Sequence, residues 1–304
     1  MKVVCPGRAS YVQSFSVFSV ASGRLGLSPC RGLEYISRVH IVFDNLGTQV
    51  QIHRRLDIRL NTLLGAIHSE GWTYDFSRDP ITAEQLQACN VLAIFTRHPV
   101  GFADANNPAV PGQSYAYDPS EISIIHDFVK AGGGLLLISN HGPSPTSTTD
   151  DTINDKVLAQ EFNVVIKPAR FHVPGVTLMS MTLANSLNSA LSASSVLFQV
   201  SEIAVHNSCA IRRSSGHPFT SIATIPSSAV DENNGPGGTN LSPANHHYAI
   251  MFQSGSGRVI VAGNSGLAGD DGCTDPSPGT IAYANNLLFL LNCFKVLAGF
   301  TPSF

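Results

Sequence analysis

The sequence predicts an α/β protein built on a doubly wound, mostly parallel sheet with an antiparallel β extension. Three observations support this prediction: short apolar runs without polar alternation, apolar residues at helical spacing between these runs, and polar or glycine-rich segments at their ends. Strands that are apolar on both faces are typical of a parallel sheet covered by helices on both sides. Right-handed crossovers make such a sheet doubly wound.

The elements of the parallel part follow one another from residue 38 to residue 166. Apolar runs predict strands at 39–43, 72–76, 91–95, 135–138 and 162–166. Helical spacing predicts the intervening helices at 56–67, 121–130 and 149–161. Thr82 is the expected N-cap of a further short helix, and Ser120 is the expected N-cap of the helix that starts at Glu121.

The stretch from 167 to 256 has a different pattern, in which short β-like runs alternate with loops rich in Gly, Pro and Asn. We expect antiparallel strands here, extending the sheet or covering an edge, at 196–200, 203–205, 221–225 and 248–252. A strand at 258–262 and a closing helix at 281–297 then return to the first pattern. The sequence therefore predicts one α/β domain over residues 38–304, with a β-rich insertion at about 167–256.

Residues 1–37 are Ser-rich and irregular, and we interpret them as an N-terminal arm or extension. Residues 14–21 have the apolar character of a signal-peptide core, but serines interrupt the run and only Lys2 and Arg8 are charged before it. We therefore expect a cytoplasmic location. A bridge between Cys5 and Cys30 stays open, whereas Cys89 and Cys293 fall in apolar patterns and are expected to be buried thiols.

The charge and the cysteine spacing exclude several classes of protein. The net charge is −3, and no basic cluster is longer than the arginine pairs at 54–55 and 212–213, so no nucleic-acid partner is expected. The longest apolar runs, such as 287–291, are too short to span a bilayer. The six cysteines form no C-x-x-C pair, which excludes a zinc ribbon. The expected partner is a small molecule, and no nucleotide or organic cofactor is indicated.

Two segments resemble a known superfamily. Residues 128–141 read FVKAGGGLLLISNH, and residues 257–265 read GRVIVAGNS, followed by Asn285-Asn286-Leu287 in the closing helix. Together they resemble the class I glutamine-amidotransferase-like superfamily, especially its non-amidotransferase, trehalose-utilisation-protein-like branch. The resemblance covers roughly 38–166 and 245–298, and it implies a flavodoxin-like, amidotransferase-like sheet.

The sequence departs from that superfamily at the position that matters for its chemistry. The resemblance implies a nucleophilic Cys in a Gly-x-Cys-x-Gly turn after a central strand, but the comparable turn here is Ser139-Asn140-His141-Gly142. The downstream His-x-Glu pair of amidotransferases is also absent. Glutamine hydrolysis by that mechanism is therefore excluded.

The candidate site follows from the fold, because ligands of open α/β sheets bind at the carboxyl ends of the strands. His141 is the first candidate there, as a general base or a metal ligand. Asp44 follows the first strand and is expected to orient His141 or to bind a metal, and Asn140 is expected to stabilise an oxyanion. The plainer interpretations are a His that hydrogen-bonds its loop and an Asp that forms an Asx-turn or a helix cap.

Further strand-exit residues complete the predicted site. Asn45, His98 and Asn264 are expected to contact substrate, and Asn264 is also a second candidate for the oxyanion donor. Asp270 and Asp271 offer hard oxygen ligands that suit Ca²⁺. The alternative for this pair, as for Asp150-Asp151, is a solvated acidic loop or a helix N-terminus.

Two motifs that could supply a nucleophile match their known patterns only in part. Ser265 lies in a near match to a Gly-x-Ser-x-Gly elbow, but Leu267 stands at the final Gly and a loop follows where a helix is required. Cys209 follows His206 by three residues, and side chains three apart in a strand face opposite sides.

The sequence thus leaves two functions open. One is a hydrolase in which water, polarised by Ca²⁺ in one version, attacks a small ester- or lactone-type carbonyl without a Ser or Cys nucleophile. The other is a non-catalytic module that binds a carbohydrate, another small polar ligand or a protein.

Overall fold

One mixed sheet runs through the part of the chain that the computed structural model describes, namely residues 39–44, 46, 60–97, 115–143, 150–184, 196–233, 240–270 and 280–300. The chain divides by its internal contacts into Met1–Ser37 and Arg38–Phe304, and every described residue belongs to the second unit. The predicted arm at 1–37 and the Cys5–Cys30 bridge lie outside the described residues.

Five parallel strands form the half of the sheet that the sequence predicted most directly. In spatial order they are β2 (Thr73–Ser77), β1 (His40–Asp44), β3 (Val91–Phe95), β4 (Gly134–Ile138) and β13 (Gly257–Ala262). All four pairings between them are parallel. The predicted α/β class with a mostly parallel central sheet is therefore confirmed.

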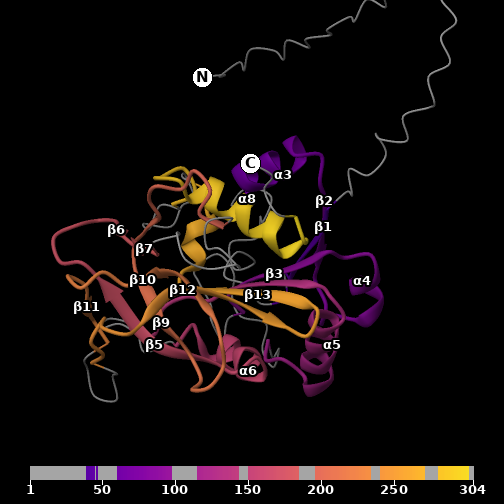
Figure 1. The fold of residues 1–304 in the computed structure, drawn as a ribbon, viewed down its shortest axis with the longest axis horizontal. Helices are drawn as coiled ribbons and strands as arrows, with labels where there is room; N and C mark the ends of the chain where they lie inside the picture. The colour runs from indigo at the N-terminus through magenta and orange to yellow at the C-terminus, as the bar shows by residue number, and fades with distance from the viewer. Residues whose placement is uncertain are drawn as a thin grey trace, which may run out of the picture. The chain divides into compact units, whose positions relative to one another are not determined.

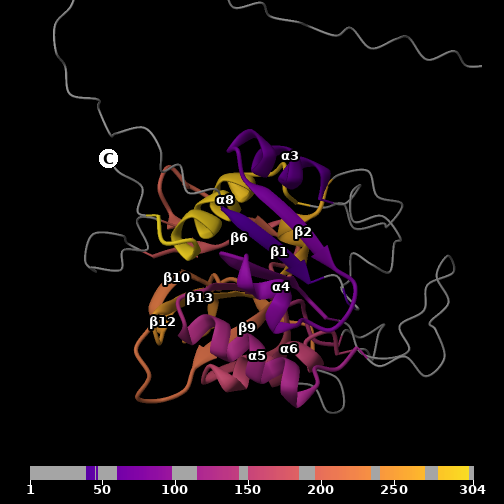
Figure 2. The same cartoon turned by 90° about the vertical axis from the view of Figure 1, so that its right-hand side faces the viewer.

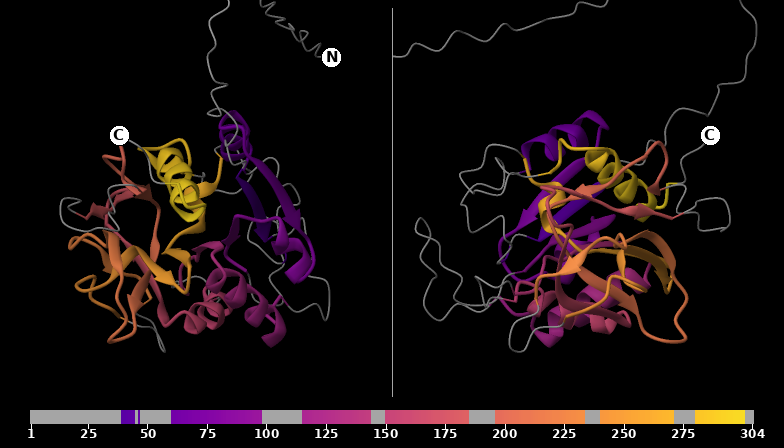
Figure 3. Two further views of the ribbon diagram at one scale, coloured as in Figure 1. Left: turned by 45° about the vertical axis from the view of Figure 1, so that its right-hand side comes forward. Right: turned by 90° about the vertical axis from the view of Figure 1, so that its left-hand side faces the viewer.

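Antiparallel strands extend the sheet beyond β13. The order continues with β12 (His247–Ser254), β9 (Ser208–Arg213), β5 (Val164–His172) and β11 (Val230–Asp231). On this side β10 (Thr220–Thr224) pairs with β12 and with β7 (Thr182–Leu183), while β6 (Met179–Ser180) and β8 (Ala204–Val205) form a separate two-stranded sheet. Figure 3 shows the strands of this extension gathered on one side of the parallel strands.

The extension corrects two sequence-based predictions. The strand predicted at 162–166 is part of β5, which is longer and pairs antiparallel with β9, because the chain after α6 runs into the extension and not into the parallel set. The run at 196–200 is not a strand but a helical turn, in which Val200 N–H donates to Leu197 O. Its apolar residues are buried as this turn packs into the core.

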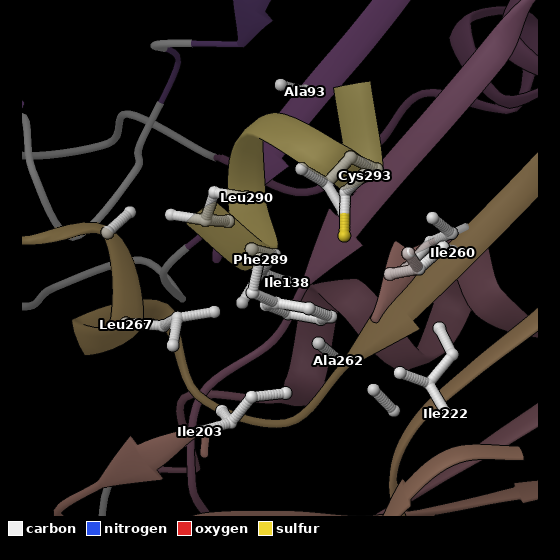
Figure 4. Close-up of a cluster of buried hydrophobic side chains, with 14 of the residues drawn as sticks. Ala93, Ile138, Ile203, Ile222, Ile260, Ala262, Leu267, Phe289, Leu290 and Cys293 are labelled. Atoms are coloured by element: carbon white, nitrogen blue, oxygen red, sulfur yellow. The ribbon is translucent and has the colours of Figure 1, made fainter. Parts of the chain in front are cut away.

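Helices cover both faces of the parallel strands. Helices α3 (Asn61–Ser69) and α8 (Asn286–Leu297) lie on one face, and α4 (Ala83–Gln87), α5 (Pro119–Lys130) and α6 (Ile153–Glu161) lie on the other (Figures 1 and 2). The strands alternate accordingly: Ile41 and Phe43 belong to the core under α3 and α8, while Val42 belongs to the core under α5 and α6. Figure 4 shows the side chains of Phe289 and Cys293 reaching from α8 toward the sheet.

Capping explains where the helices begin. Thr82 forms the predicted N-cap of α4 in a capping box with Gln85. The N-cap of α5 is Asp118 and not Ser120, because the Asp118 carboxylate accepts the Ser120 N–H at 2.8 Å and the helix already starts at Pro119. Among the described residues, no helix is long and apolar enough to cross a membrane.

The closing helix starts at Asn286 and not at residue 281 as predicted. The Asn286 amide holds the preceding turns in place: its Nδ2 donates to Ala204 O at 2.7 Å and to Thr280 O at 2.6 Å, and its Oδ1 accepts the Ala204 N–H. The buried residues 280 and 281 therefore belong to a turn that leads into the helix.

Two glycines provide a matched test of this packing. A Cβ at Gly257, at the start of β13, would lie 2.1 Å from Val129 O and 2.2 Å from Gly133 O, whereas a Cβ at Gly65, in α3, meets no atom within 4 Å. Gly257→Ala is expected to lower the free energy of unfolding by about 2–4 kcal/mol, because backbone has to move. Gly65→Ala is expected to raise it by about 0.5–1 kcal/mol. Urea denaturation measures both, and equal effects of the two substitutions would contradict the described packing.

Candidate functional site

Polar side chains collect at the carboxyl edge of the parallel strands, as the fold rule predicts. Asp44 ends β1, Arg97 follows β3, Ser139 and Asn140 follow β4, and Asn264 follows β13. All five are buried, although each bears a polar side chain. A buried polar group has to find hydrogen-bond partners inside the protein, so the partners define what this edge can do.

The guanidinium of Arg97 is the centre of the largest polar cluster at this edge. Arg97 is fully buried and donates Nε and Nη2 to Asp44 Oδ2, at 3.0 and 2.8 Å. Its Nη1 and Nη2 donate to the two carboxylate oxygens of Glu121, each at 2.8 Å. The ring of Tyr117 stacks on the guanidinium, with its centroid 3.9 Å from Cζ. Both carboxylates are buried as well, so Arg97 ties β1, β3 and the start of α5 together.

The backbone at the end of β3 directs Arg97 into this position. Thr96 has a φ of 51°, in the left-handed region that a β-branched residue rarely adopts. It is held there by hydrogen bonds from its N–H and its hydroxyl to Ile138 O on β4. The next peptide is held by α6, because the Arg97 N–H donates to Asp155 Oδ1 at 3.2 Å and Asn154 Nδ2 donates to Arg97 O at 3.1 Å.

Burial dominates the ionisation of the carboxyl groups in this cluster. It raises the pKa of Asp44 to about 6, although the Arg97 charge and the Leu46 N–H act in the opposite direction. Burial also raises the pKa of Asp155 to about 7, against the opposing hydrogen bonds from Ser139 and the Arg97 backbone. Two carboxyl groups therefore titrate near neutral pH behind one guanidinium.

The turn after β4 holds His141 at the surface of this edge. The His141 Nδ1–H donates to the carbonyl of its own neighbour, Gly142, at 2.8 Å, and Nε2 lies 3.9 Å from Asp151 Oδ2. The same Asp151 oxygen accepts Asn140 Nδ2 at 3.1 Å. The His141 side chain is 20% exposed, whereas that of Asp151 is 8% exposed. His141 is thus the accessible member of a group that also contains Asn140 and Asp151.

Gly142 fixes this turn against the β extension. Its N–H donates to Ala169 O on β5 at 2.9 Å, and a Cβ at this position would lie 1.7 Å from Pro168 O. Only a glycine can therefore pass β5 this closely. The glycine in the Ser139-Asn140-His141-Gly142 turn serves close packing, and the turn and β5 form one structural unit.

Helix α6 supplies the remaining polar groups. At its start, polar residues are buried and apolar residues are exposed. Asn154 and Asp155 are buried at its start, whereas Ile153 and Val157 are 47% and 48% exposed. Asp155 Oδ2 accepts the Ser139 hydroxyl at 2.8 Å, so one carboxylate joins the exits of β3 and β4. The first turn of the helix therefore directs its polar side to the sheet, while Leu158 and Ala159 in the second half are buried in the apolar core.

The structure places the other predicted residues as follows. Asn264 Nδ2 donates to Asn207 Oδ1 at 2.8 Å, and Asn264 Oδ1 is buried without a hydrogen-bond partner among the described residues. Asp270 accepts the Thr62 N–H through both oxygens, at 3.2 and 3.1 Å, and so caps the start of α3. Asn45, His98 and Asp271, the other predicted substrate and metal residues, lie outside the described residues.

The metal hypothesis gains no support from the described donor groups. Within the described ranges, no three His, Cys, Asp or Glu side chains are grouped so that they could hold a metal ion. Asp150 forms an ion pair with Lys156 and accepts the Thr152 N–H and hydroxyl, while Asp151 contacts Asn140. The two adjacent carboxylates therefore serve different partners.

The two nucleophile motifs are not assembled. Cys209 is fully buried in β9, and burial raises the pKa of its thiol well above the usual range. His206 directs its Nδ1–H to Thr177 O at 3.0 Å. Ser265 is a buried residue of the 3₁₀ turn η1 (Ser265–Ala268) and not of an elbow that leads into an α-helix. Cys89 and Cys293 are buried free thiols, as predicted.

Sequence reasoning placed Arg97 in a strand-exit loop without giving it a role, and it considered Asp151 only in an acidic pair that could bind a metal. It missed Tyr117, Glu121 and Asp155, which also organise this edge. One signal in the sequence pointed to α6. In the segment 149–161, polar residues recur at 151, 154 and 155, on one helical face, while apolar residues at 153 and 157 fall on the other. A helix with that pattern next to a polar strand exit is expected to bury its polar face.

Comparisons with known proteins identify the fold only. No protein-family model matches the chain, and no curated protein matches its sequence. The mmIFT52 N-terminal domain is similar in structure, with a TM-score of 0.58, 11% identity and coverage of 87% of this chain and 100% of that domain. The cytoplasmic protein STM1381 from Salmonella typhimurium LT2 has a TM-score of 0.51 and 15% identity, covering 85% of this chain and 99% of its own.

Below these two lies a ThuA-like protein from Bacteroides uniformis ATCC 8492, with a TM-score of 0.49 and 12% identity, covering 88% of this chain and 94% of its own. At such identities, the first two structures show that this α/β architecture is shared over nearly the whole domain. Activity, ligand and partner do not follow from that similarity.

The Arg97 guanidinium, which bonds to both Asp44 and Glu121, leads to a prediction about stability. Arg97→Lys keeps the charge but cannot make four bonds to two carboxylates, so it is expected to lower the free energy of unfolding by about 2–4 kcal/mol. Arg78→Lys, at an exposed position, is the matched control and is expected to change it by less than about 0.5 kcal/mol. Urea denaturation provides the measurement, and a mild effect at position 97 would show that the bridge is not a fixed part of the fold.

The helix cap at Asp270 is tested separately. Asp270→Asn weakens the acceptor for the Thr62 N–H and removes a charge at the start of α3, so a loss of about 0.5–1 kcal/mol is expected. Asp79→Asn, at an exposed position, is the control. The loss is expected to be the same in EDTA and in Ca²⁺, as judged by thermal unfolding. A loss that appears only with Ca²⁺ would assign Asp270 to a metal site instead.

Proposed function

We propose that this protein is a binding module for a neutral, polyhydroxylated small molecule such as a carbohydrate, held at the carboxyl edge by His141, Asp151 and Asn140. The observation that carries the proposal is the burial of Asp44 against Arg97. Both Nε and Nη2 of Arg97 donate to Asp44 Oδ2, which commits the carboxylate that a His141-based hydrolase was expected to use. What the edge offers to a ligand is therefore a hydrogen-bonding surface on a rigid base.

The charges around this surface favour a neutral ligand. Among the described residues, the carboxyl groups of Asp44, Glu121 and Asp151 lie at the edge near Arg97, whose guanidinium is already shared by two of them. An anionic ligand placed beside such carboxylates at low dielectric would be repelled by them. Hydroxyl groups avoid this repulsion, because they donate to carboxylates and accept from an imidazole or an amide.

The group of three residues suits vicinal hydroxyls. Asp151 Oδ2 faces His141 Nε2 at 3.9 Å and Asn140 Nδ2 at 3.1 Å, so a carboxylate acceptor, an imidazole and an amide lie side by side. His141 is the accessible member of the set, and its ring can accept from or donate to a hydroxyl, while the Asp151 carboxylate behind it has lone pairs for a second hydroxyl besides the one that accepts from Asn140. Membership of the non-amidotransferase branch of the amidotransferase-like superfamily belongs to this proposal, since a turn without the nucleophilic Cys is compatible with a binding role. A cytoplasmic location stays a prediction.

Ligand binding is the direct test. Saturation-transfer NMR against methyl glycosides and the corresponding sugar acids is expected to detect binding of glycosides, with the acids at least about tenfold weaker. His141→Ala and Asp151→Asn are each expected to weaken binding by about tenfold, which corresponds to one lost hydrogen bond. His68→Ala, an exposed histidine on α3, is the control. Preference for the acids, or glycoside binding untouched by His141→Ala, would refute the proposal.

One observation favours a second candidate, the hydrolase. With Nδ1–H donating to Gly142 O, the neutral form of His141 carries no proton on Nε2, and Asp151 Oδ2 at 3.9 Å can stabilise the protonated ring. In this version Asp151 takes the orienting role first expected of Asp44, and Asn140 stays the candidate oxyanion donor.

The hydrolase is tested with a panel of small esters and lactones, with EDTA and with added Ca²⁺. Turnover that falls by about 100-fold or more in His141→Ala would support general-base catalysis. Loss of turnover in EDTA that Ca²⁺ restores would support the calcium-dependent version. Inactivity of the wild-type protein across the panel, together with glycoside binding, would leave the binding module.

A further inference from the structure

Polar bonds from two buried side chains hold the first turn of α6 to the sheet. Its two buried residues there, Asn154 and Asp155, bond to the Arg97 backbone and to the Ser139 hydroxyl. Its apolar residues Ile153 and Val157 face away from the sheet. Apolar burial begins only in the second half of the helix, at Leu158 and Ala159. The docking of the first turn therefore depends on the state of these polar groups.

Asp155 is the titratable group among them, and charged or titratable groups lie around it. Arg97 after β3 and Asp44 at the end of β1 act on its charge, and its charge acts in turn on Tyr117 before α5 and on Cys209 on β9. Further out, Glu121 of α5 bonds to Arg97, His141 lies near Asp151, and Asp150 pairs with Lys156. Within this set, one guanidinium is shared between Asp44 and Glu121, and Lys156 is paired with Asp150. An ionised Asp155 therefore adds a negative charge that has no cation of its own among the described residues of the buried cluster.

We propose that the first turn of α6 is a proton-dependent clasp, which stays docked on the exits of β3 and β4 while Asp155 is protonated and opens more often once Asp155 ionises. The protonated form has a partner for its O–H, since the Ser139 hydroxyl at 2.8 Å can accept as well as donate. The Arg97 N–H continues to donate to the other oxygen. Opening exposes the carboxylate to water, which removes the cost of its burial.

The direction of the pH effect follows from the two states of Asp155. Burial raises the pKa of Asp155 to about 7 in the docked state, whereas a carboxyl exposed by opening has a pKa of roughly 3.9. A group whose pKa is higher in the docked state stabilises docking fully below the exposed pKa and loses that effect as the pH rises to the docked pKa. Opening therefore becomes about tenfold more frequent per pH unit between roughly pH 4 and 7, and levels off above that.

The clasp would regulate the edge site, a link that rests on the proposed function. Asp151 lies one turn before Asp155 and holds the Asn140 amide, so opening of the first turn separates Asp151 from Asn140 and His141. Ligand binding is then stronger at pH 5.5 than at pH 7.5. The clasp itself is tested without ligand, so its failure is distinct from failure of the binding proposal.

Amide hydrogen exchange followed by NMR reports the clasp directly. The Arg97 N–H bonds to Asp155, and the Lys156 N–H bonds to Thr152 O in the first turn. In the wild-type protein the protection factors of both amides are expected to fall about 30-fold from pH 5.5 to 7.5. In Asp155→Asn, which mimics the protonated form, they are expected to change by less than about threefold. Asp127→Asn, an exposed aspartate on α5, is expected to behave like the wild type.

The same exchange data separate the clasp from histidine titration and from global unfolding. A pH effect that comes from His141 or from Asp44 would persist in Asp155→Asn and would overturn the proposal. An unchanged protection factor in the wild-type protein would overturn it as well. A parallel fall at Leu136, in the central strand β4, would mean global unfolding and also overturns a local clasp. Ser139→Ala is a second variant. The Ser139 hydroxyl can bond either form of Asp155 but bonds the ionised carboxylate more strongly, so its removal is expected to move upward the pH at which protection levels off. A downward or absent shift contradicts the assignment to Asp155.

Discussion

The buried guanidinium of Arg97 is the interaction on which the carboxyl edge of this sheet depends. It makes four hydrogen bonds to the carboxylates of Asp44 and Glu121, and its backbone bonds to Asp155 and Asn154. One residue after β3 thus fixes the end of β1 and the starts of α5 and α6. Such a buried network contributes less to net stability than to uniqueness, because desolvation offsets much of the attraction while a lost partner is costly. The edge is therefore well suited to hold surface groups in one geometry.

Much of the fold followed from the sequence, because the pattern that makes a buried parallel strand is local. The runs at 39–43, 91–95 and 135–138 are apolar throughout, and each forms a strand within one residue of its predicted bounds. The same reasoning failed at 196–200, where a buried apolar run is a turn. A run of apolar residues indicates that the segment is buried, but it does not by itself distinguish a strand from a tightly packed turn.

The site was predictable in position but not in connectivity. The rule for open sheets selected the exits at Asp44, Asn140 and Asn264, and these residues are indeed buried at one edge. Their partners could not be read from the sequence, because Arg97 lies 53 residues from Asp44 and 24 from Glu121. Asp118 and Ser120 illustrate the same limit at short range, since both are good caps and the helix start decides between them. Polar pairing depends on three-dimensional placement in a way that apolar patterning does not.

The closeness of Gly142 to Pro168 has a consequence for how this protein can change over time. The His141 turn and β5 are separated by less than the space of one methyl group, so neither can shift without the other. Strand β5 of the antiparallel extension therefore packs directly against the turn that carries His141. Related proteins that differ in the extension have to keep the backbone position of β5 near Pro168, or they lose the conformation of the His141 turn. Variation in this fold should then concentrate in the far strands of the extension and spare β5.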